Sequence, residues 1–188
     1  MIRCLITDGT FSQDQIRWMA HLSHWIEAGV ELVQIRERDL PARDLAALTR
    51  QVLRIPNPQG TKILVNDRAD VAMACKAHGV HLRDGSVAPD KFARPGFLVT
   101  ISCHEIEDAQ KAAGASFILL APIFKPLSKM DHRPVLGTAA IAELTGRSPI
   151  PVLALGGIDH DNARACLDAG AAGIAGISYF ARLATRAD

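Results

Sequence analysis

The sequence has little of what marks membrane, nucleic-acid-binding or secreted proteins. No apolar run approaches the ~18 residues of a membrane-spanning helix. The formal net charge of the 188 residues is only +1, which provides no broad surface for nucleic acid or anionic lipid. The first residues read as a strand rather than as a signal peptide. We therefore expect a cytoplasmic protein without a membrane or nucleic-acid partner, in which any anion site is local.

Closely spaced cysteines are also lacking. The four cysteines are scattered without the CxxC spacing of a metal or redox site: Cys4, Cys75, Cys103 and Cys166. We expect them to be buried free thiols in a reducing compartment rather than disulfides or metal ligands. No low-complexity segment or linker interrupts the chain, so residues 1–188 are expected to form one domain with a sizeable core.

Short β-rich runs alternate regularly with segments of helical period. The eight runs lie at residues 3–7, 31–37, 62–66, 79–82, 97–102, 117–124, 151–157 and 173–178. Such alternation indicates parallel βαβ units with right-handed crossovers. Eight of them predict an α/β fold of the (β/α)8 TIM-barrel type, compact with short loops, because such barrels usually need at least ~200 residues. The competing architecture is an open doubly wound sheet.

The end of the second run carries an unusual group of polar residues. Gln34, Arg36 and Arg38 have the same parity and therefore share one face of an extended strand. Two guanidinium groups on one face repel each other unless an anion or a buried carboxylate lies between them, and each can bind a phosphate in a bidentate manner. We predict an anion site here. The alternative is a structural network in which Arg36 pairs with Glu37 or Asp67.

The ends of the seventh and eighth runs indicate a second anion site. Gly156 and Gly157 close the seventh run, and Ser178 closes the eighth, each just before a helix. Glycines allow backbone N–H groups to approach a ligand closely, and helix N-termini favour negative charge. The loops after strands seven and eight are the usual phosphate site of these barrels. The alternative is that the glycines only turn the chain.

Two further segments carry candidate ligand-binding residues. Asn66 and Asp67 close the third run, where Asn66 can donate to a phosphate and Asp67 can hold Mg²⁺. An ordinary turn and helix cap is the alternative interpretation. Lys129 lies in a long loop after the sixth run, where it adds a positive charge if the loop closes over a ligand, and is otherwise a surface lysine.

Together these residues resemble the thiamine phosphate synthase/TenI family, and the likeness spans nearly the whole chain in the right order. The matching segments are "ITD" 6–8, "QIRER" 34–38, "VNDRADVA" 65–72, "GVHL" 79–82, "ISCH" 101–104, "APIFKPLSK" 121–129, "PVLALGGI" 151–158 and "AGAAGIAGIS" 169–178. The resemblance implies the same barrel, a role in thiamine biosynthesis and a phosphorylated small-molecule substrate. It also suggests a homo-oligomer, for which the sequence carries no interface signal.

The resemblance implies one of two activities. Synthases join a hydroxymethylpyrimidine diphosphate to a thiazole phosphate and release pyrophosphate with the help of Mg²⁺. TenI-type members tautomerise a thiazole carboxylate phosphate and would need no cofactor. By matching positions, Asp67 would be a metal ligand, the diphosphate or pyrimidine would be held by Gln34, Arg36, Arg38, Asn66, Ser102 and Lys129, and the thiazole phosphate by Gly157, Ile177 and Ser178.

The sequence departs from the synthase pattern at two places. Ser86 stands where synthases carry a second magnesium aspartate, and Arg83 replaces a glycine. Pro126 and Ser128 stand where synthases usually carry a threonine pair. Losing one metal carboxylate and one hydroxyl donor would cost roughly 2–4 kcal/mol of transition-state stabilisation, or ~30- to 1000-fold in rate.

His104 follows the fifth run and is a candidate for proton transfer, because imidazole titrates near neutral pH. It matches the TenI catalytic histidine, although many synthases have a histidine there too, and a helix cap is the alternative. On these grounds the sequence favours a TenI-type tautomerase over a synthase, with His104, Arg36 and Lys129 as catalytic residues. A non-catalytic phosphate-ligand binder or regulator and another phosphate-binding barrel isomerase remain as alternatives.

Overall fold

Eight parallel strands close into one barrel in chain order, which confirms the predicted (β/α)8 architecture. The computed structural model describes residues 1–125 and 133–184, with the backbone alone for 182–184. The strands are β1 (Ile2–Ile6), β2 (Leu32–Ile35), β3 (Lys62–Asn66), β4 (Gly79–Leu82), β5 (Leu98–Cys103), β6 (Phe117–Leu120), β7 (Val152–Leu155) and β8 (Gly173–Gly176). Strand β8 pairs with β1 to complete the ring, with Gly173 opposite Ile2. A side chain at Gly173 would collide with the Ile2 carbonyl oxygen, so glycine permits this closure.

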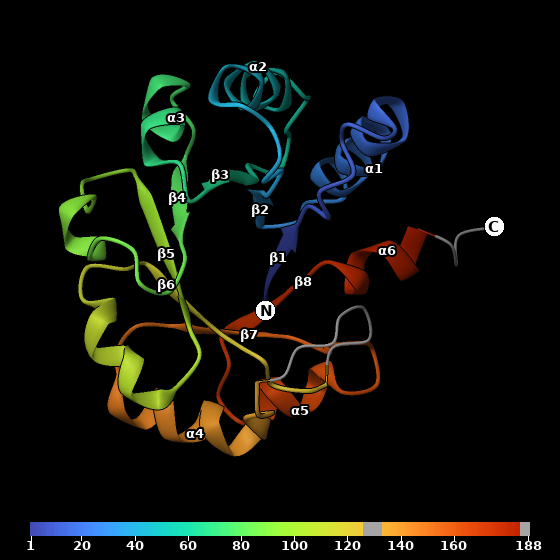
Figure 1. Cartoon of the computed structure of the whole chain (residues 1–188). Helices are drawn as coiled ribbons and strands as arrows, with labels where there is room; N and C mark the ends of the chain where they lie inside the picture. The colour runs from blue at the N-terminus through green and yellow to red at the C-terminus, as the bar shows by residue number, and fades with distance from the viewer. Residues whose placement is uncertain (126–132, 185–188) are drawn as a thin grey trace.

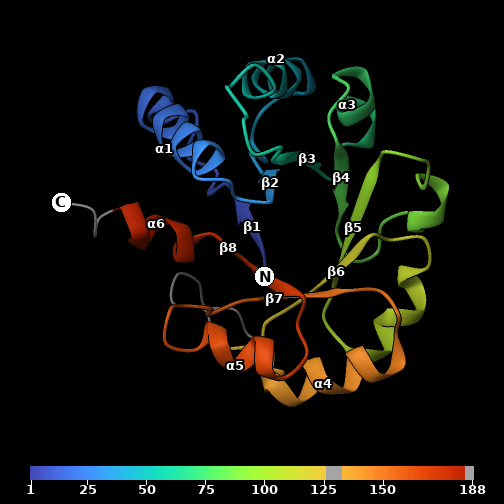
Figure 2. The same cartoon turned by 180° about the vertical axis from the view of Figure 1, so that it is seen from behind.

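The helices form an outer ring around the strands (Figures 1 and 2). They are α1 (Gln15–Glu27), α2 (Ala42–Val52), α3 (Ala69–Ala74), α4 (Gly137–Arg147), α5 (Ala163–Asp168) and α6 (Ser178–Ala184), with 3₁₀ turns η1 (Pro89–Lys91) and η2 (Ile106–Ala112). Because α3, α5 and α6 are short, 188 residues suffice for eight βα units. No helix in the ranges that the structure describes has the length and apolar character needed to cross a membrane.

Four predicted strands are longer than the observed ones. Strand β2 ends at Ile35 and β6 at Leu120, whereas we expected ends at residues 37 and 124. Strand β7 ends at Leu155 and β8 at Gly176, whereas we expected ends at residues 157 and 178. Pro122 follows β6 closely and has no N–H group to extend the ladder. The helix expected after β5 is the 3₁₀ turn η2. These differences concern the ends of the elements that lead into the barrel mouth.

Alternating side chains divide the apolar residues between two cores. Outward-facing residues such as Val33 and Ile35 pack against the helices, where α2 contributes Leu45, Leu48 and Val52 from one stripe. A smaller cluster fills the barrel interior and contains Cys4, Ile6, Leu32, Leu64, Leu119, Leu153 and Ala175. All four cysteines are buried and free, as predicted.

A buried carboxylate joins the end of β2 to the loop between β1 and α1. Glu37 is 5% exposed. It accepts hydrogen bonds from Thr7 Oγ1 (2.7 Å), Gly9 N (3.2 Å), Phe11 N (3.0 Å) and Trp18 Nε1 (3.1 Å). Four donors surround one anion, so the loop and the first turns of α1 are fixed to the barrel rim.

We expect Glu37→Gln to lower the free energy of unfolding by about 2–3 kcal/mol, because the new amide group turns N–H donors toward N–H donors in a buried site. Urea denaturation followed by circular dichroism measures this change. Glu27→Gln, at an exposed position at the end of α1, is the matched control and should change stability by less than about 0.5 kcal/mol. Equal effects of the two substitutions would contradict the anchoring role of Glu37.

Candidate active site

One half of the barrel interior is polar near the carboxyl ends of the strands. Gln34 on β2 donates from Nε2 to Asn66 Oδ1 on β3 at 2.8 Å. On the neighbouring strands, His81 of β4 contacts Thr100 Oγ1 at 2.8 Å and Ser102 Oγ at 3.0 Å, both on β5. These two groups form a continuous polar surface over β2 to β5.

The Gln34 side chain has one hydrogen-bonding atom without a partner. Gln34 is 2% exposed. Its Nε2 donates to Asn66 Oδ1, and its Oε1 is buried without a hydrogen bond among the described residues. An unpaired buried acceptor costs about 1–3 kcal/mol. The site therefore offers an acceptor to a ligand that brings an N–H or O–H donor.

His81 lies beneath the predicted cations and was not among the predicted site residues. Burial, followed by the charges of Arg36, Arg38 and His104, lowers its pKa to about 3. His81 is consequently neutral at physiological pH, with one ring nitrogen donating and the other accepting. Its contact with Ser102 places that predicted residue at the interior end of the site. The signal in the sequence is its inward parity on β4.

The two arginines after β2 carry unpaired positive charge. Arg36 is half-buried and Arg38 is exposed, and neither side chain forms a hydrogen bond or ion pair within the described ranges. Burial, followed by the charge of Arg38, lowers the pKa of Arg36, and Glu37 partly opposes this. Glu37 is held by its own loop instead, so the alternative of an Arg36–Glu37 pair does not describe this rim.

Asp67 directly follows β3 in a left-handed conformation, with φ of 59°. Its Oδ2 lies 3.1 Å from Arg83 Nε, and its Oδ1 accepts from Ser86 Oγ at 3.4 Å. The carboxylate is thus neutralised by a residue from the loop after β4. Asp67 is therefore not the partner of Arg36 either.

The magnesium site implied by the resemblance can be tested against these donors. Mg²⁺ requires hard oxygen ligands in octahedral geometry. Here one carboxylate is already paired with a guanidinium, and its neighbour Ser86 is a neutral hydroxyl. Within residues 1–125 and 133–184, no group of three His, Cys, Asp or Glu side chains is arranged to hold a metal. The donors described at Asp67 do not fit a magnesium site.

His104 lies just beyond β5, and both ring nitrogens have a neighbour. Nδ1 donates to the Ala121 carbonyl oxygen at 2.8 Å, which places the proton of the neutral ring on Nδ1. Arg133 Nη1 lies 2.6 Å from Nε2 and 2.7 Å from Nδ1. The Arg133 guanidinium therefore lies against both ring nitrogens of His104. Sequence reasoning missed Arg133, for which the sequence gives no signal.

The ends of β7 and β8 present backbone donors. Gly156 and Gly157 have φ of 96° and 64°, and a side chain at Gly157 would approach the Lys125 carbonyl oxygen to 2.6 Å. Glycine is thus required by the turn and by the adjacent chain. The N–H groups of Gly156, Gly157, Ile177 and Ser178 make no hydrogen bond in the described part of the chain. Both the turn and the anion-site interpretations are compatible with this geometry.

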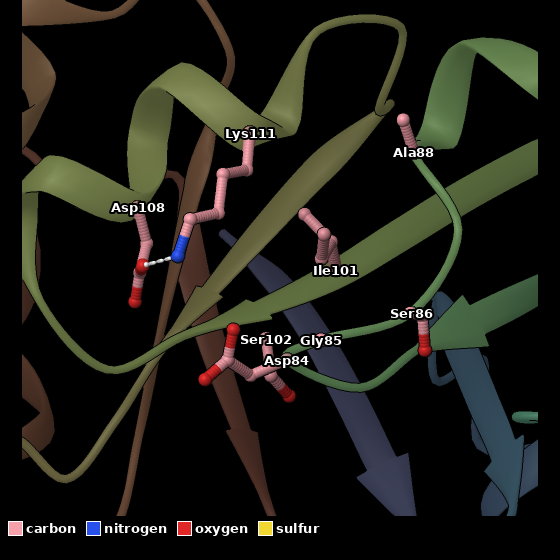
Figure 3. A pocket seen from close by; sticks show the side chains of 8 residues that line it. All are labelled: Asp84, Gly85, Ser86, Ala88, Ile101, Ser102, Asp108 and Lys111. Carbon is pink, nitrogen blue, oxygen red and sulfur yellow. Dashed lines mark hydrogen bonds and ion pairs between the residues drawn. The ribbon is translucent and has the colours of Figure 1, made fainter.

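Two cavities flank the barrel mouth. One of about 230 Å³ lies between the loop after β4 and η2. In Figure 3, Ser86 and Asp84 line it from that loop, and Lys111 bonds Asp108 on η2. A larger cavity of about 550 Å³ lies between α1 and α6 and includes Ile177.

Lys129, Pro126 and Ser128 lie outside the described residues. Their predicted roles therefore stay predictions.

Comparisons with known proteins agree with the barrel fold and show the family. The sequence matches the profile of the family described as "Thiamine monophosphate synthase" over residues 3–180. It is 41% identical over 159 residues to the "Putative thiamine-phosphate synthase 2" of Aquifex aeolicus, covering 82% of this chain and 85% of that protein. It is 36% identical over 158 residues to the thiamine-phosphate synthase of Roseiflexus sp., covering 81% and 67%. The structure resembles the thiamine phosphate pyrophosphorylase from Pyrococcus furiosus with a TM-score of 0.81 and 27% identity, covering 94% and 85%.

The low pKa of His81 predicts a pH dependence of stability. Between pH 6.5 and about 3 the unfolded chain binds a proton at His81 that the folded chain does not, so stability present above pH 6.5 is lost as the pH falls. Lowering the pH from about 7 to about 4 should reduce the free energy of unfolding of wild type by about 2–3 kcal/mol more than that of His81→Gln. Urea denaturation at each pH measures the difference. Substitution of the exposed His24 by Gln should leave the wild-type slope unchanged, and a His81→Gln slope equal to wild type would refute the assignment.

Proposed function

Because this chain belongs to the thiamine monophosphate synthase family, we propose that it is a transferase that joins a hydroxymethylpyrimidine diphosphate to a thiazole phosphate and releases pyrophosphate. The family match spans residues 3–180, and the relatives cited above are named as synthases, some of them as putative ones. The sequence alone favoured the tautomerase. The relatives' names and two features of the site favour the transferase instead.

The unpaired Gln34 Oε1 is the observation that carries the proposal. It is a buried acceptor in the polar half of the barrel interior, beside Asn66 at the carboxyl end of β3. The amino group of an aminopyrimidine supplies N–H donors that would satisfy it, whereas the ring of a thiazole carboxylate phosphate brings none. A buried acceptor discriminates strongly against a ligand that lacks the matching donor.

The arginines after β2 suit the diphosphate of the same substrate. Arg36 and Arg38 have no carboxylate partner within the described residues, and their mutual repulsion would be relieved by an anion between them. In the proposed step the bond between the pyrimidine methylene carbon and the diphosphate oxygen breaks, and its electron pair leaves with pyrophosphate. The thiazole nitrogen lone pair forms the new C–N bond. The guanidinium groups would stabilise the about three negative charges of the leaving group.

The thiazole phosphate would bind at the opposite side of the mouth. Gly156, Gly157, Ile177 and Ser178 bring N–H groups without partners in the described part of the chain, and backbone N–H groups bind phosphate oxygens well. The phosphate would thus be held away from the diphosphate, with the thiazole ring between the two sites.

The environment of His104 also supports the transferase. A tautomerase that uses His104 would need a free lone pair to accept the substrate proton. Here Nδ1 is committed to Ala121, and the Arg133 guanidinium lies against both ring nitrogens, beside the Nε2 lone pair. We therefore assign His104 a positioning role at the end of β5.

Product analysis separates the candidate functions. The transferase predicts that pyrophosphate and thiamine phosphate form only when both substrates are present, measured by phosphate release after pyrophosphatase and by chromatography. Assays should contain either Mg²⁺ or EDTA. A tautomerase would instead convert thiazole carboxylate phosphate alone and lose that turnover in His104→Ala. Binding of both substrates without either reaction would identify a non-catalytic binder.

Gln34→Met tests the buried acceptor directly. We expect KM for the pyrimidine diphosphate to rise at least about tenfold, because methionine cannot accept from the amino group. KM for the thiazole phosphate should stay within about twofold, and stability should change by less than about 1 kcal/mol, since removing the unpaired acceptor offsets the lost hydrogen bond to Asn66. Steady-state kinetics and thermal melting provide these values. Gln51→Met on the exposed face of α2 is the control, and an equal rise of both KM values would contradict the proposal.

A further inference from the structure

At the rim between β3 and β4, the charges of Asp67 and Arg83 cancel in a side-chain ion pair. Asp67 contributes one negative charge, Arg83 one positive charge, and Ser86 none, whereas Asp84 of the same loop lines the smaller cavity together with Lys111. The charges of two carboxylates and one divalent cation would also sum to zero. The same local charge is thus obtained here with a guanidinium group of the protein.

The geometry of Arg83 leaves most of its donors available. The Arg83–Asp67 ion pair is formed by Nε at 3.1 Å, and neither terminal nitrogen forms a hydrogen bond within the described ranges. The Arg83 side chain is 75% exposed, so its fork can turn toward a ligand at the mouth. A guanidinium fork matches two phosphate oxygens in a bidentate contact.

Asp67 holds this guanidinium at a defined place. Its left-handed backbone is uncommon for a residue other than glycine. Its N–H donates to the His81 carbonyl oxygen at 2.7 Å, which ties it to the end of β4. Ser86 Oγ supports the other carboxylate oxygen. The carboxylate therefore holds the Nε side of Arg83 at the end of β3 and leaves the terminal nitrogens exposed.

A magnesium ion at Asp67 would meet unfavourable surroundings. It would find one carboxylate and one neutral hydroxyl, and it would lie close to the guanidinium that already pairs with that carboxylate. Two cations sharing one carboxylate repel each other. The site thus accommodates one cation, and the Arg83 guanidinium is that cation.

We infer that Arg83 is the resident cation of the diphosphate subsite, so that this chain binds a diphosphate without a divalent metal. With Arg36 and Arg38, it places three guanidinium groups over β2 to β4. The inference rests on the proposed function, because a diphosphate substrate is what the subsite would hold.

Calorimetric titration with inorganic pyrophosphate tests this without turnover. We expect wild type to bind pyrophosphate in EDTA with a Kd within about twofold of that in Mg²⁺, and Arg83→Gln to raise this Kd at least about tenfold. Arg50→Gln, on the exposed face of α2, removes the same charge far from the rim and should bind as wild type. Thermal melting of each variant confirms folding, since an exposed ion pair contributes little to stability. Binding that requires Mg²⁺, or an Arg83→Gln variant that binds as wild type, would overturn the inference.

A second variant replaces the guanidinium group beside Asp67 with a second carboxylate. Ser86→Asp combined with Arg83→Gly places a second carboxylate beside Asp67 and removes the guanidinium. This variant should bind Mn²⁺ at least about tenfold more tightly than wild type, measured by electron paramagnetic resonance. Equal Mn²⁺ affinity of the two proteins would contradict the exchange of roles. If pyrophosphate binds in EDTA but no thiamine phosphate forms, the proposed function fails while the inference stands.

Discussion

The protein depends on a constraint that a closed barrel imposes on its own interior. Every second side chain of each strand points into a space from which bulk water is excluded, so a polar side chain there must find a partner within the protein or in a ligand. His81 meets this requirement through Thr100 and Ser102 and stays neutral. Gln34 meets it only in part, because its Nε2 bonds Asn66 while its Oε1 has no partner among the described residues. This unequal satisfaction of hydrogen bonds marks the half of the barrel where a polar ligand fits.

The charges at the mouth follow from how the two nearby carboxylates are used. Glu37 is buried by the β1–α1 loop, and Asp67 is paired with Arg83. Neither is left to neutralise Arg36 or Arg38, so the rim over β2 is electropositive although the whole chain has a net charge of only +1. A binding site for an anion is thus produced by directing the anionic side chains away from it. The net charge of the whole chain does not reveal such a local separation of positive and negative side chains.

Periodicity predicted all eight strands but not all of their ends. The bounds of β3 and β4 agree with the predicted runs, whereas β2, β6, β7 and β8 end earlier. The apolar pattern continues past β6 into Pro122 and Ile123, which are buried, and Ile123 still donates its N–H to the Leu155 carbonyl oxygen at the end of β7. Parity correctly placed Gln34 inside the barrel. It gave no information on Arg133, which approaches His104 from 29 residues further along the chain.

The sequence by itself determined the barrel, the order of its strands and the set of polar residues at their carboxyl ends, because parallel strands bring those ends to one rim. Only the tertiary structure decided which of these groups are paired and which are free. Arg83 rather than Arg36 neutralises Asp67, and Arg133 rather than solvent covers His104. Pairing depends on differences of a few ångström between side chains from separate strands and on their burial. Neither quantity is encoded in the spacing of residues along the chain.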